Sequence, residues 1–259
     1  MQTIKPLTLS FEFFPPKSFE GMEKLMETAK QLSHYSPDFF SVTFGAGGST
    51  RQRTLETVAK LQKISKIPIA PHISCIGYDR NDLANILEEF QKLEVRRLIV
   101  LRGDMPSGMI SAGDFELAHE FVKFIRVTTE DYFHIEVAAY PECHPQADDM
   151  EQDIINLQKK YEAGANGAIT QYFFNTDSYF YLLDECAKRQ INMPIVPGIM
   201  PIMDFDKLVR FSKVCGAEIP RWLYKRLESY KGDEQAIREF GREVMIKICE
   251  QLLRGGAPG

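Results

Sequence analysis

The sequence predicts a βα barrel, an α/β fold in which parallel strands and helices alternate. Seven apolar, strand-like runs end in polar, glycine or proline clusters at intervals of 27 to 36 residues. This fits the roughly 30 residues that one strand, a crossover helix and the next parallel strand require. The length of 259 residues also matches the roughly 250 residues typical of such barrels. We therefore expect a single domain, residues 1–259, with functional side chains at the rim formed by the strand ends.

The expected strands are short runs that each end at a polar or glycine position. They are residues 7–14, 39–44, 69–74, 97–101, 135–140, 167–172 and 194–198. Amphipathic segments lie between them, and the clearest spans residues 149–163. There Met150, Ile154 and Leu157 recur at helical spacing, and Gly164 supplies a C-terminal cap.

The end of the chain predicts two further elements. Residues 222–231 are expected to form an extra turn, and residues 235–253 a long last helix. After this helix the sequence ends at GGAPG, and we find only seven strands. A barrel with an open seam would expose unpaired strand edges, so we expect the native protein to continue into an eighth strand and a final helix.

Alternation within the strands predicts which side chains face the barrel axis, because successive side chains of a strand point to opposite faces. In the first run the apolar side chains share one face, and Thr8, Ser10 and Glu12 share the other. The same parity groups small and polar residues in later runs, namely Ser41 with Thr43, Ala70 with His72 and Ser74, and Glu136 with Ala138 and Tyr140. We therefore expect a polar chamber with Glu12, Thr43, His72 and Tyr140 at its upper rim.

Two carboxylates are candidates for acid–base chemistry. Glu12 is directed inward among phenylalanines and prolines, and burial there predicts a raised pKa that suits a general acid. A structural carboxylate paired with an Arg or Lys across the barrel fits the same pattern. Asp104 ends the run LIVLRGD at the rim, and the alternative for it is a simple ion pair with Arg102.

Composition excludes several classes of protein. The net charge of -5 and the pI near 5.7 leave no basic surface for nucleic acid. No apolar stretch reaches the roughly 20 residues of a membrane span, and the N-terminus does not resemble a signal peptide. We therefore expect a cytoplasmic protein with five reduced cysteines. The ligand types His72, Cys75, Glu142, Cys143 and His144 lack the spacing of a zinc site, so no metal is expected. The loop GAGGST lacks the glycine pattern of a dinucleotide-binding Rossmann unit.

Seven motifs carry a family resemblance. SFEFFPPK, SVTFGAGGS, APHISC, LRGD, AAYPECHPQA, AGANGAITQYFF and VPGIMPI occur in this order from residue 10 to at least residue 205. Together they resemble the methylenetetrahydrofolate reductase family. The resemblance implies a (βα)8 TIM barrel and a flavoprotein oxidoreductase of one-carbon metabolism and methionine biosynthesis. It also implies that non-covalently bound FAD carries hydride from NAD(P)H to 5,10-methylenetetrahydrofolate, giving 5-methyltetrahydrofolate.

The resemblance also assigns roles to matching residues. It makes Glu12 the catalytic acid that helps open the five-membered ring of the folate, and places Asp104 near both pterin and flavin. Gln171 would hydrogen-bond the substrate and Phe205 would stack on it. The implied FAD contacts are Thr43, Phe44, Ala46, His72, Arg102, Gly103, Asp104, Leu117, Ala118, Tyr140, His144, Ala147, Asp153, Asn156, Lys159 and Lys160.

The sequence predicts a single rim, which is too small to hold the nicotinamide and the folate together beside FAD. We therefore expect the two substrates to use one pocket in turn, which gives ping-pong kinetics. The resemblance further implies a homo-oligomer and, in the missing last strand, an Arg directed toward the substrate. The sequence does not distinguish NADH from NADPH. Two alternatives remain open: a lyase or hydrolase that uses Glu12 and Asp104 as an acid–base pair, and a non-catalytic or partner-dependent subunit that binds FAD or folate.

Overall fold

The computed structural model describes residues 7–44, 48–104 and 113–259. It confirms the predicted α/β fold. Seven strands lie in one sheet in the order in which they occur along the chain, β1-β2-β3-β4-β5-β6-β7, and the pairs β1–β2, β2–β3, β3–β4, β4–β5 and β6–β7 are parallel. This sequential parallel order, with helices between the strands, is that of a TIM barrel.

The strands are confirmed where the sequence predicts them, although most are shorter. They are β1 (Ser10–Phe13), β2 (Phe39–Val42), β3 (Ile69–Ser74), β4 (Arg97–Leu101), β5 (His134–Ala139), β6 (Gly167–Thr170) and β7 (Ile195–Val196). The helices are α1 (Phe19–Ser33), α2 (Gly48–Ile64), α3 (Arg80–Lys92), α4 (Ala118–Thr129), α5 (Met150–Glu162), α6 (Thr176–Lys188), α7 (Phe205–Cys215), α8 (Arg221–Ser229) and α9 (Glu234–Arg254). The expected extra turn is thus the helix α8, and the long last helix is α9. The described residues contain no eighth strand.

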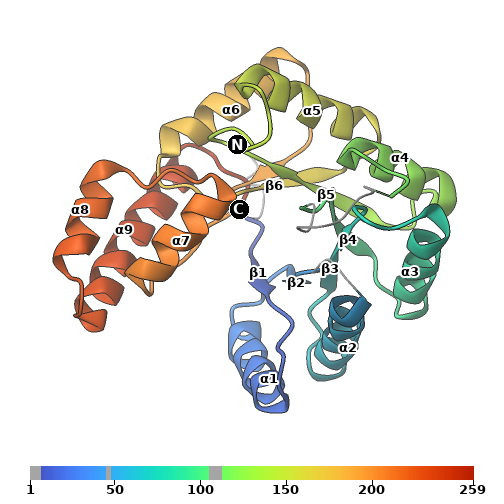
Figure 1. Ribbon diagram of the computed structural model, residues 1–259, viewed down its shortest axis with the longest axis horizontal. Helices are drawn as coiled ribbons and strands as arrows, with labels where there is room; N and C mark the ends of the chain where they lie inside the picture. The colour runs from blue at the N-terminus through green and yellow to red at the C-terminus, as the bar shows by residue number, and fades with distance from the viewer. Residues whose placement is uncertain (1–6, 45–47, 105–112) are drawn as a thin grey trace, which may run out of the picture. The chain divides into compact units, whose positions relative to one another are not determined.

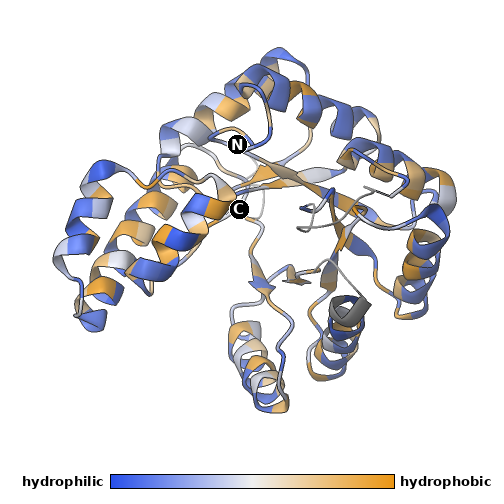
Figure 2. Cartoon of the chain, in the orientation of Figure 1, coloured by the Kyte–Doolittle hydropathy of each residue, from blue (hydrophilic) through white to orange (hydrophobic). Residues whose placement is uncertain are grey.

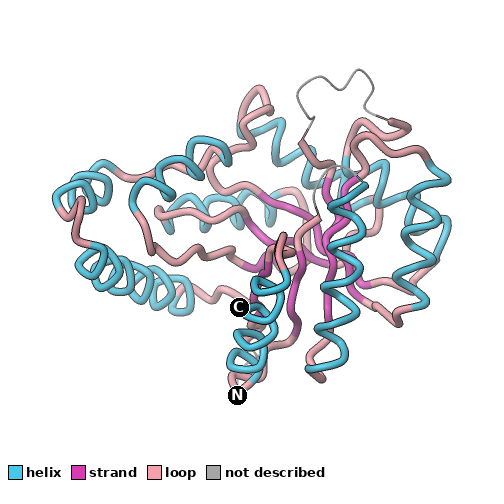
Figure 3. Tube along the Cα trace, turned by 60° about the horizontal axis from the view of Figure 1, so that its bottom comes forward, coloured by secondary structure: helices cyan, strands magenta, loops and turns pink. Residues whose placement is uncertain are grey.

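The chain divides into two compact units, which are described separately. We call Leu7–Val137 with Lys159–Asn166 the N-terminal unit, and Ala138–Gln158 with Gly167–Gly259 the C-terminal unit. In the N-terminal unit the strands lie inside and α1 to α4 lie outside them (Figures 1 and 3). Its core contains Phe40, Val42, Ile73 and Leu98, all of which are fully buried.

Helix starts in the N-terminal unit follow from local capping. The Ser18 hydroxyl accepts a hydrogen bond from the backbone N–H of Gly21 at 3.1 Å, and the Asp79 carboxylate accepts one from Asp82 at 2.8 Å. Such side-chain acceptors satisfy backbone donors that have no partner within the helix. Apolar and polar residues alternate along each helix (Figure 2), so one stripe of the helix can be buried while the other meets solvent.

Small side chains lie beside Glu12 across the sheet. Glu12 of β1 is in register with Ser41 of β2, and Ser41 is in register with Ala70 of β3. His72 follows two residues after Ala70, so it lies on the same face, one step nearer the strand ends. This register leaves space above β2 for longer side chains from β1 and β3.

Candidate functional site

Glu12 and His72 meet across the intervening strand β2 in the N-terminal unit. Glu12 Oε2 lies 3.3 Å from His72 Nε2. The His72 side chain is only 9% exposed, whereas that of Glu12 is 49% exposed, so the imidazole is enclosed and the carboxylate still meets solvent. The prediction from strand parity that these residues share a face is confirmed, and the partner of the carboxylate is a histidine rather than an Arg or Lys.

The expectation of a raised pKa for Glu12 is wrong for this structure. Burial acts to raise the pKa of the carboxyl group, but the hydrogen bond and the charge of His72 outweigh burial and lower it. A carboxylate held in this way is ionised at neutral pH. It therefore needs a source of protons before it can act as an acid.

The end of β4 is fastened to β3 by backbone contacts around Gly103. The Arg102 carbonyl accepts a hydrogen bond from Ile76 N at 2.9 Å. Gly103 has φ of 87°, and a Cβ atom there would lie 2.8 Å from Cβ of Ser74. Glycine is therefore required for both its conformation and its lack of a side chain. Arg102 Nε donates to the Gly103 carbonyl at 3.2 Å, and Asp104 is exposed at the end of this segment.

Thr43 and Phe44 follow β2 in the same unit. The Thr43 N–H donates to the Phe13 carbonyl at 2.9 Å, which continues the pairing of β1 with β2. The Phe44 ring lies 6.1 Å from that of Tyr78. Both residues are partly exposed. Ala46, the next expected FAD contact, lies outside the described residues.

A group of basic residues lies near the start of α4 in the N-terminal unit. Lys159 and Lys160 act electrostatically on His119, the residue that follows the expected contacts Leu117 and Ala118. Burial lowers the pKa of His119, Glu120 raises it, and the two lysine charges lower it further. The two lysine ammonium groups could bind an anion such as a pyrophosphate.

The expected FAD contacts of the C-terminal unit are organised by one buried carboxylate. Asp153 is 7% exposed, and its Oδ2 accepts a hydrogen bond from the His144 backbone at 2.9 Å. The rings of Tyr140 and His144 meet edge to face with centroids 4.5 Å apart, and the Ala147 N–H donates to the His144 carbonyl at 2.9 Å. The sequence motif AAYPECHPQA thus forms a closed loop beside the first turns of α5.

Asn156 lies one turn further along α5. Its Oδ1 accepts a hydrogen bond from Gln152 Nε2 at 3.2 Å. A carboxylate and an amide at this spacing offer acceptors and donors of the kind that bind sugar hydroxyls. A binding role for this polar face stays a prediction.

The two expected substrate residues of the C-terminal unit differ in accessibility. Gln171 is partly exposed directly after β6; its backbone N–H donates to Ala139 at 2.8 Å, and its side-chain oxygen accepts from Tyr172 N at 3.0 Å. Phe205, at the start of α7, is only 5% exposed and packs edge to face against Tyr224. A stacking role would require Phe205 to change its environment, and this role stays a prediction.

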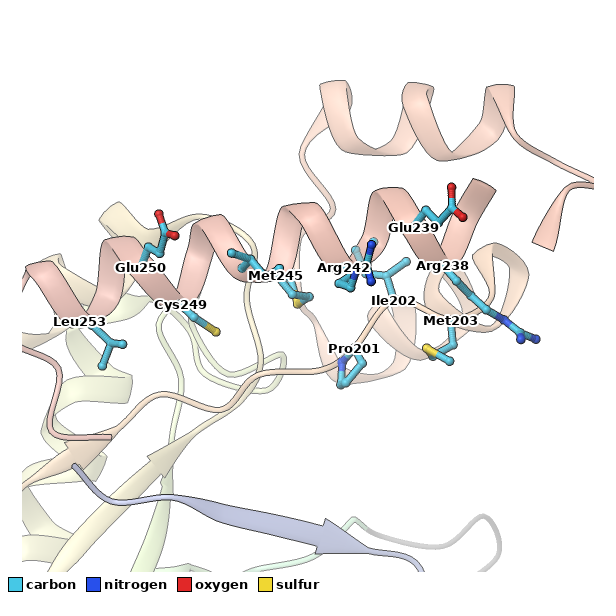
Figure 4. Close-up of a pocket in the computed structure, with 12 residues that line it drawn as sticks. Pro201, Ile202, Met203, Arg238, Glu239, Arg242, Met245, Cys249, Glu250 and Leu253 are labelled. Carbon is cyan, nitrogen blue, oxygen red and sulfur yellow. The ribbon is translucent and has the colours of Figure 1, made fainter. Parts of the chain in front are cut away.

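A pocket of about 590 Å³ lies along α9 in the C-terminal unit. Its lining is mostly apolar, with Ile202, Met203, Met245 and Leu253 among the residues that surround it (Figure 4). None of the expected catalytic or binding residues lines it. Four charged residues, Arg238, Glu239, Arg242 and Glu250, also line it, together with Cys249, whose pKa is raised by burial.

Neither a metal site nor a membrane span is found in the described part of the chain. Over residues 7–44, 48–104 and 113–259, no three His, Cys, Asp or Glu side chains gather as metal ligands would. Within these same segments, no helix is both long and apolar enough to cross a bilayer.

Sequence reasoning missed one residue near the expected site and the neighbours of another. Ser41 was grouped with the inward-facing residues, but its place between Glu12 and Ala70 depends on the strand register. His119 gave no signal of its own, because a single histidine on an amphipathic helix is not distinctive. Its proximity to Lys159 and Lys160, forty residues later, appears only in the folded chain.

The fold and the residues at its strand ends define an α/β protein of the TIM-barrel class with a carboxylate–imidazole pair at one rim. A family model described as methylenetetrahydrofolate reductase matches residues 2–259. The chain therefore belongs to the methylenetetrahydrofolate reductase family.

Individual relatives agree with this assignment. A 5,10-methylenetetrahydrofolate reductase of Buchnera aphidicola subsp. Schizaphis graminum is 37% identical over 95% of this chain and 83% of the relative. Methylenetetrahydrofolate reductase (NADH) 1 of Arabidopsis thaliana is 36% identical over 95% of this chain but only 44% of its own length.

A solved structure supports the fold. It belongs to a Clostridium thermocellum protein described as binding two copies of 5-methyl-5,6,7,8-tetrahydrofolic acid. It matches with a TM-score of 0.66 over 97% of this chain and 84% of that chain, at 18% sequence identity.

Proposed function

We propose that this chain reduces 5,10-methylenetetrahydrofolate to 5-methyltetrahydrofolate with a reduced nicotinamide as the hydride source and FAD as the cofactor. Membership of the family carries the substrate class, and the solved relative described as binding 5-methyltetrahydrofolate is in keeping with a folate ligand. The observation that carries the chemistry is Glu12, a half-exposed carboxylate that contacts His72 at the end of β1. A reductive opening of a cyclic aminal needs a proton donor at this kind of position.

FAD, when bound, would supply the hydride carrier between the nicotinamide and the folate. The residues present fit such a group in each unit. In the N-terminal unit, Lys159 and Lys160 provide the positive charge that a pyrophosphate requires, and His119, whose pKa is lowered by burial, offers a neutral imidazole beside them. In the C-terminal unit, Asp153 and Asn156 provide the acceptors and amide donors that ribose hydroxyls require.

Glu12 performs the proton chemistry in this proposal. Its carboxyl group gives a proton to the ring nitrogen of the folate as the bond between that nitrogen and the methylene carbon breaks. The carbon is then left as an electrophile that accepts hydride. Asp104, at the exposed end of the LRGD segment, orients the folate, and Gln171 hydrogen-bonds it.

The nicotinamide and the folate would occupy the same pocket in turn, which gives ping-pong kinetics. The name of the Arabidopsis relative specifies NADH, and we propose NADH as the first donor to test, with NADPH as the alternative. We further propose that the protein acts in the cytoplasm as a homo-oligomer, as the family resemblance implies.

An anaerobic visible spectrum tests the proposal. The purified chain, supplied with FAD, should show an oxidised flavin band that bleaches with NADH or NADPH and returns when 5,10-methylenetetrahydrofolate is added. A colourless protein that binds no FAD would contradict the cofactor assignment. Bleaching without recovery on addition of the folate would contradict the reductase activity and favour a partner-dependent subunit.

A further inference from the structure

The ion pair between Glu12 and His72 leaves one requirement of the proposed function unexplained. Glu12 has to donate a proton, yet its contact with His72 keeps the carboxyl group ionised while the site is open to solvent. The proton must therefore arrive at Glu12 after the substrate has bound. The enclosed imidazole 3.3 Å away is the proton source that the structure offers.

We infer that His72 is a positioning residue that stores the proton for Glu12 and passes it to the carboxylate when the folate covers the pair. The inference rests on the proposed folate reduction. It goes beyond that proposal by assigning His72 a role in proton supply in addition to cofactor contact.

Solvent exclusion provides the driving force for this transfer. Glu12 is 49% exposed and His72 is 9% exposed, so a ligand placed over the rim removes water mainly from the carboxylate. Desolvation disfavours charged forms and raises the proton affinity of a carboxylate. When the pair holds one proton between its two members, the loss of water favours the neutral arrangement, in which that proton lies on Glu12 Oε2.

The proton balance of the cycle closes. The N–H bond of His72 breaks as the O–H bond of Glu12 forms, and that O–H bond breaks when the folate nitrogen takes the proton. The pair ends the turnover with one proton fewer. When the product leaves, the exposed Glu12 carboxylate takes a proton from water and the imidazole regains it through the same 3.3 Å contact.

The strand between the two residues makes the contact possible. β2 has the sequence Phe-Phe-Ser-Val, so it places no charged group between β1 and β3. Ser41 is the β2 residue in register with Glu12, and it is 4% exposed. A larger side chain at position 41, directly beside Glu12 and Ala70, would crowd the Glu12 side chain where it extends over β2. The pair can thus be broken without changing either member.

The first test needs no substrate and uses the purified chain. Carbon-13 NMR of the glutamate carboxyl groups, assigned with Glu12→Gln, should show Glu12 titrating below the usual glutamate range in the wild type. In His72→Gln and in Ser41→Val the midpoint should rise toward that range. Ser10→Val, on the same strand face but one step further from His72, is the matched control and should leave the midpoint unchanged. An unshifted midpoint in both His72→Gln and Ser41→Val would overturn the inference whatever the activity of the protein.

The second test follows the pH dependence of the two half-reactions. In His72→Gln we expect the folate half-reaction to slow by about 10- to 100-fold at pH 7. Its rate should fall by about tenfold per pH unit across the assay range, because Glu12 must then be protonated before the folate binds. The wild-type rate should be level over the lower part of that range. Flavin reduction by the nicotinamide needs no proton from Glu12, so its pH profile should follow that of the wild type whatever change in rate the altered cofactor contact causes.

A loss of rate in His72→Gln with an unchanged pH profile would show that His72 has only a structural role. A wild type that lacks the folate half-reaction would overturn the inference together with the proposed function. A wild type that has this half-reaction, with no change in Glu12 titration in the variants, would overturn the inference alone.

Discussion

The carboxyl group of Glu142 holds the loop after β5 in place through a hydrogen bond. Its Oε2 accepts a hydrogen bond from the Glu218 backbone N–H at 2.7 Å, within the C-terminal unit. The loop that carries Tyr140 and His144 is thereby joined to the segment that follows α7. Burial raises the pKa of Glu142; the backbone hydrogen bond lowers it, and the charge of Glu218 raises it again, with a net upward shift.

This upward shift of the Glu142 pKa predicts that Glu142→Gln raises the free energy of unfolding by an amount that depends on pH. A carboxyl group whose pKa is higher in the folded than in the unfolded chain stabilises the fold at low pH, and this contribution is lost as the pH rises through the folded pKa. Glutamine keeps an oxygen acceptor for Glu218 N but cannot ionise. The variant should therefore have a higher free energy of unfolding than the wild type at pH 7, with the difference shrinking as the pH falls toward 4.

Urea unfolding at several pH values measures this difference. Glu218→Gln is a useful control, because it leaves the backbone donor in place and removes only the second charge. Glu218→Gln should raise the free energy of unfolding by less than Glu142→Gln does, since burial is the larger cause of the shift in the Glu142 pKa. A Glu142→Gln variant that is less stable than the wild type at pH 7 would contradict the argument.

At the scale of elements, the starts of β4 and β5 are joined by an ionic cluster around one buried carboxylate. Arg97 is in register with His134. The Glu136 carboxylate is paired with the Arg97 guanidinium and lies 3.0 Å from His134 Nε2. Its side chain is 6% exposed, and Oε2 is buried without a hydrogen-bond partner. Arg97 also lies over the ring of Phe39 at 4.7 Å, which extends the cluster to β2.

Removing one member of this cluster should destabilise the N-terminal unit. Arg97→Met would leave a buried carboxylate with only His134 as its partner, and we expect a loss of about 3 kcal/mol in the free energy of unfolding. The double variant Arg97→Met with Glu136→Leu should recover most of that loss, because it buries no unpaired charge.

A double-mutant cycle in urea measures the coupling, with Glu136→Leu as the other single variant. If the free energy of unfolding of Arg97→Met alone lies within about 0.5 kcal/mol of the wild-type value, the pair of Arg97 and Glu136 contributes little to stability, as surface ion pairs do.

At the scale of the whole molecule, the strand pattern was predictable because it is local. Each apolar run ends at a polar or glycine residue, and this periodicity found β3 and β4 with their full bounds. Side-chain parity found the shared face of Glu12 and His72 for the same reason. The division into two compact units depends on contacts between distant segments, which a local pattern does not specify, and the expected single domain stays a prediction.

The details of the candidate site depend on packing that the sequence alone does not specify. The contact of Glu12 with His72 depends on the register of β1, β2 and β3, which the sequence does not specify, so the direction of the pKa shift of Glu12 was predicted wrongly. Arg97 and Glu136 are 39 residues apart, and their pairing follows from the register of β4 and β5. Phe205 illustrates a further limit, because its motif predicts a stacking role while its side chain packs in the core.

Glu12 as the acid of the folate half-reaction is the central claim, and rapid mixing of Glu12→Gln with each substrate separately tests it most directly. Flavin reduction by the nicotinamide should stay within about threefold of the wild type. Reoxidation of the reduced holoenzyme by 5,10-methylenetetrahydrofolate should slow by about 10²- to 10⁴-fold. Equal slowing of both half-reactions, or reoxidation at the wild-type rate, would contradict the acid role of Glu12.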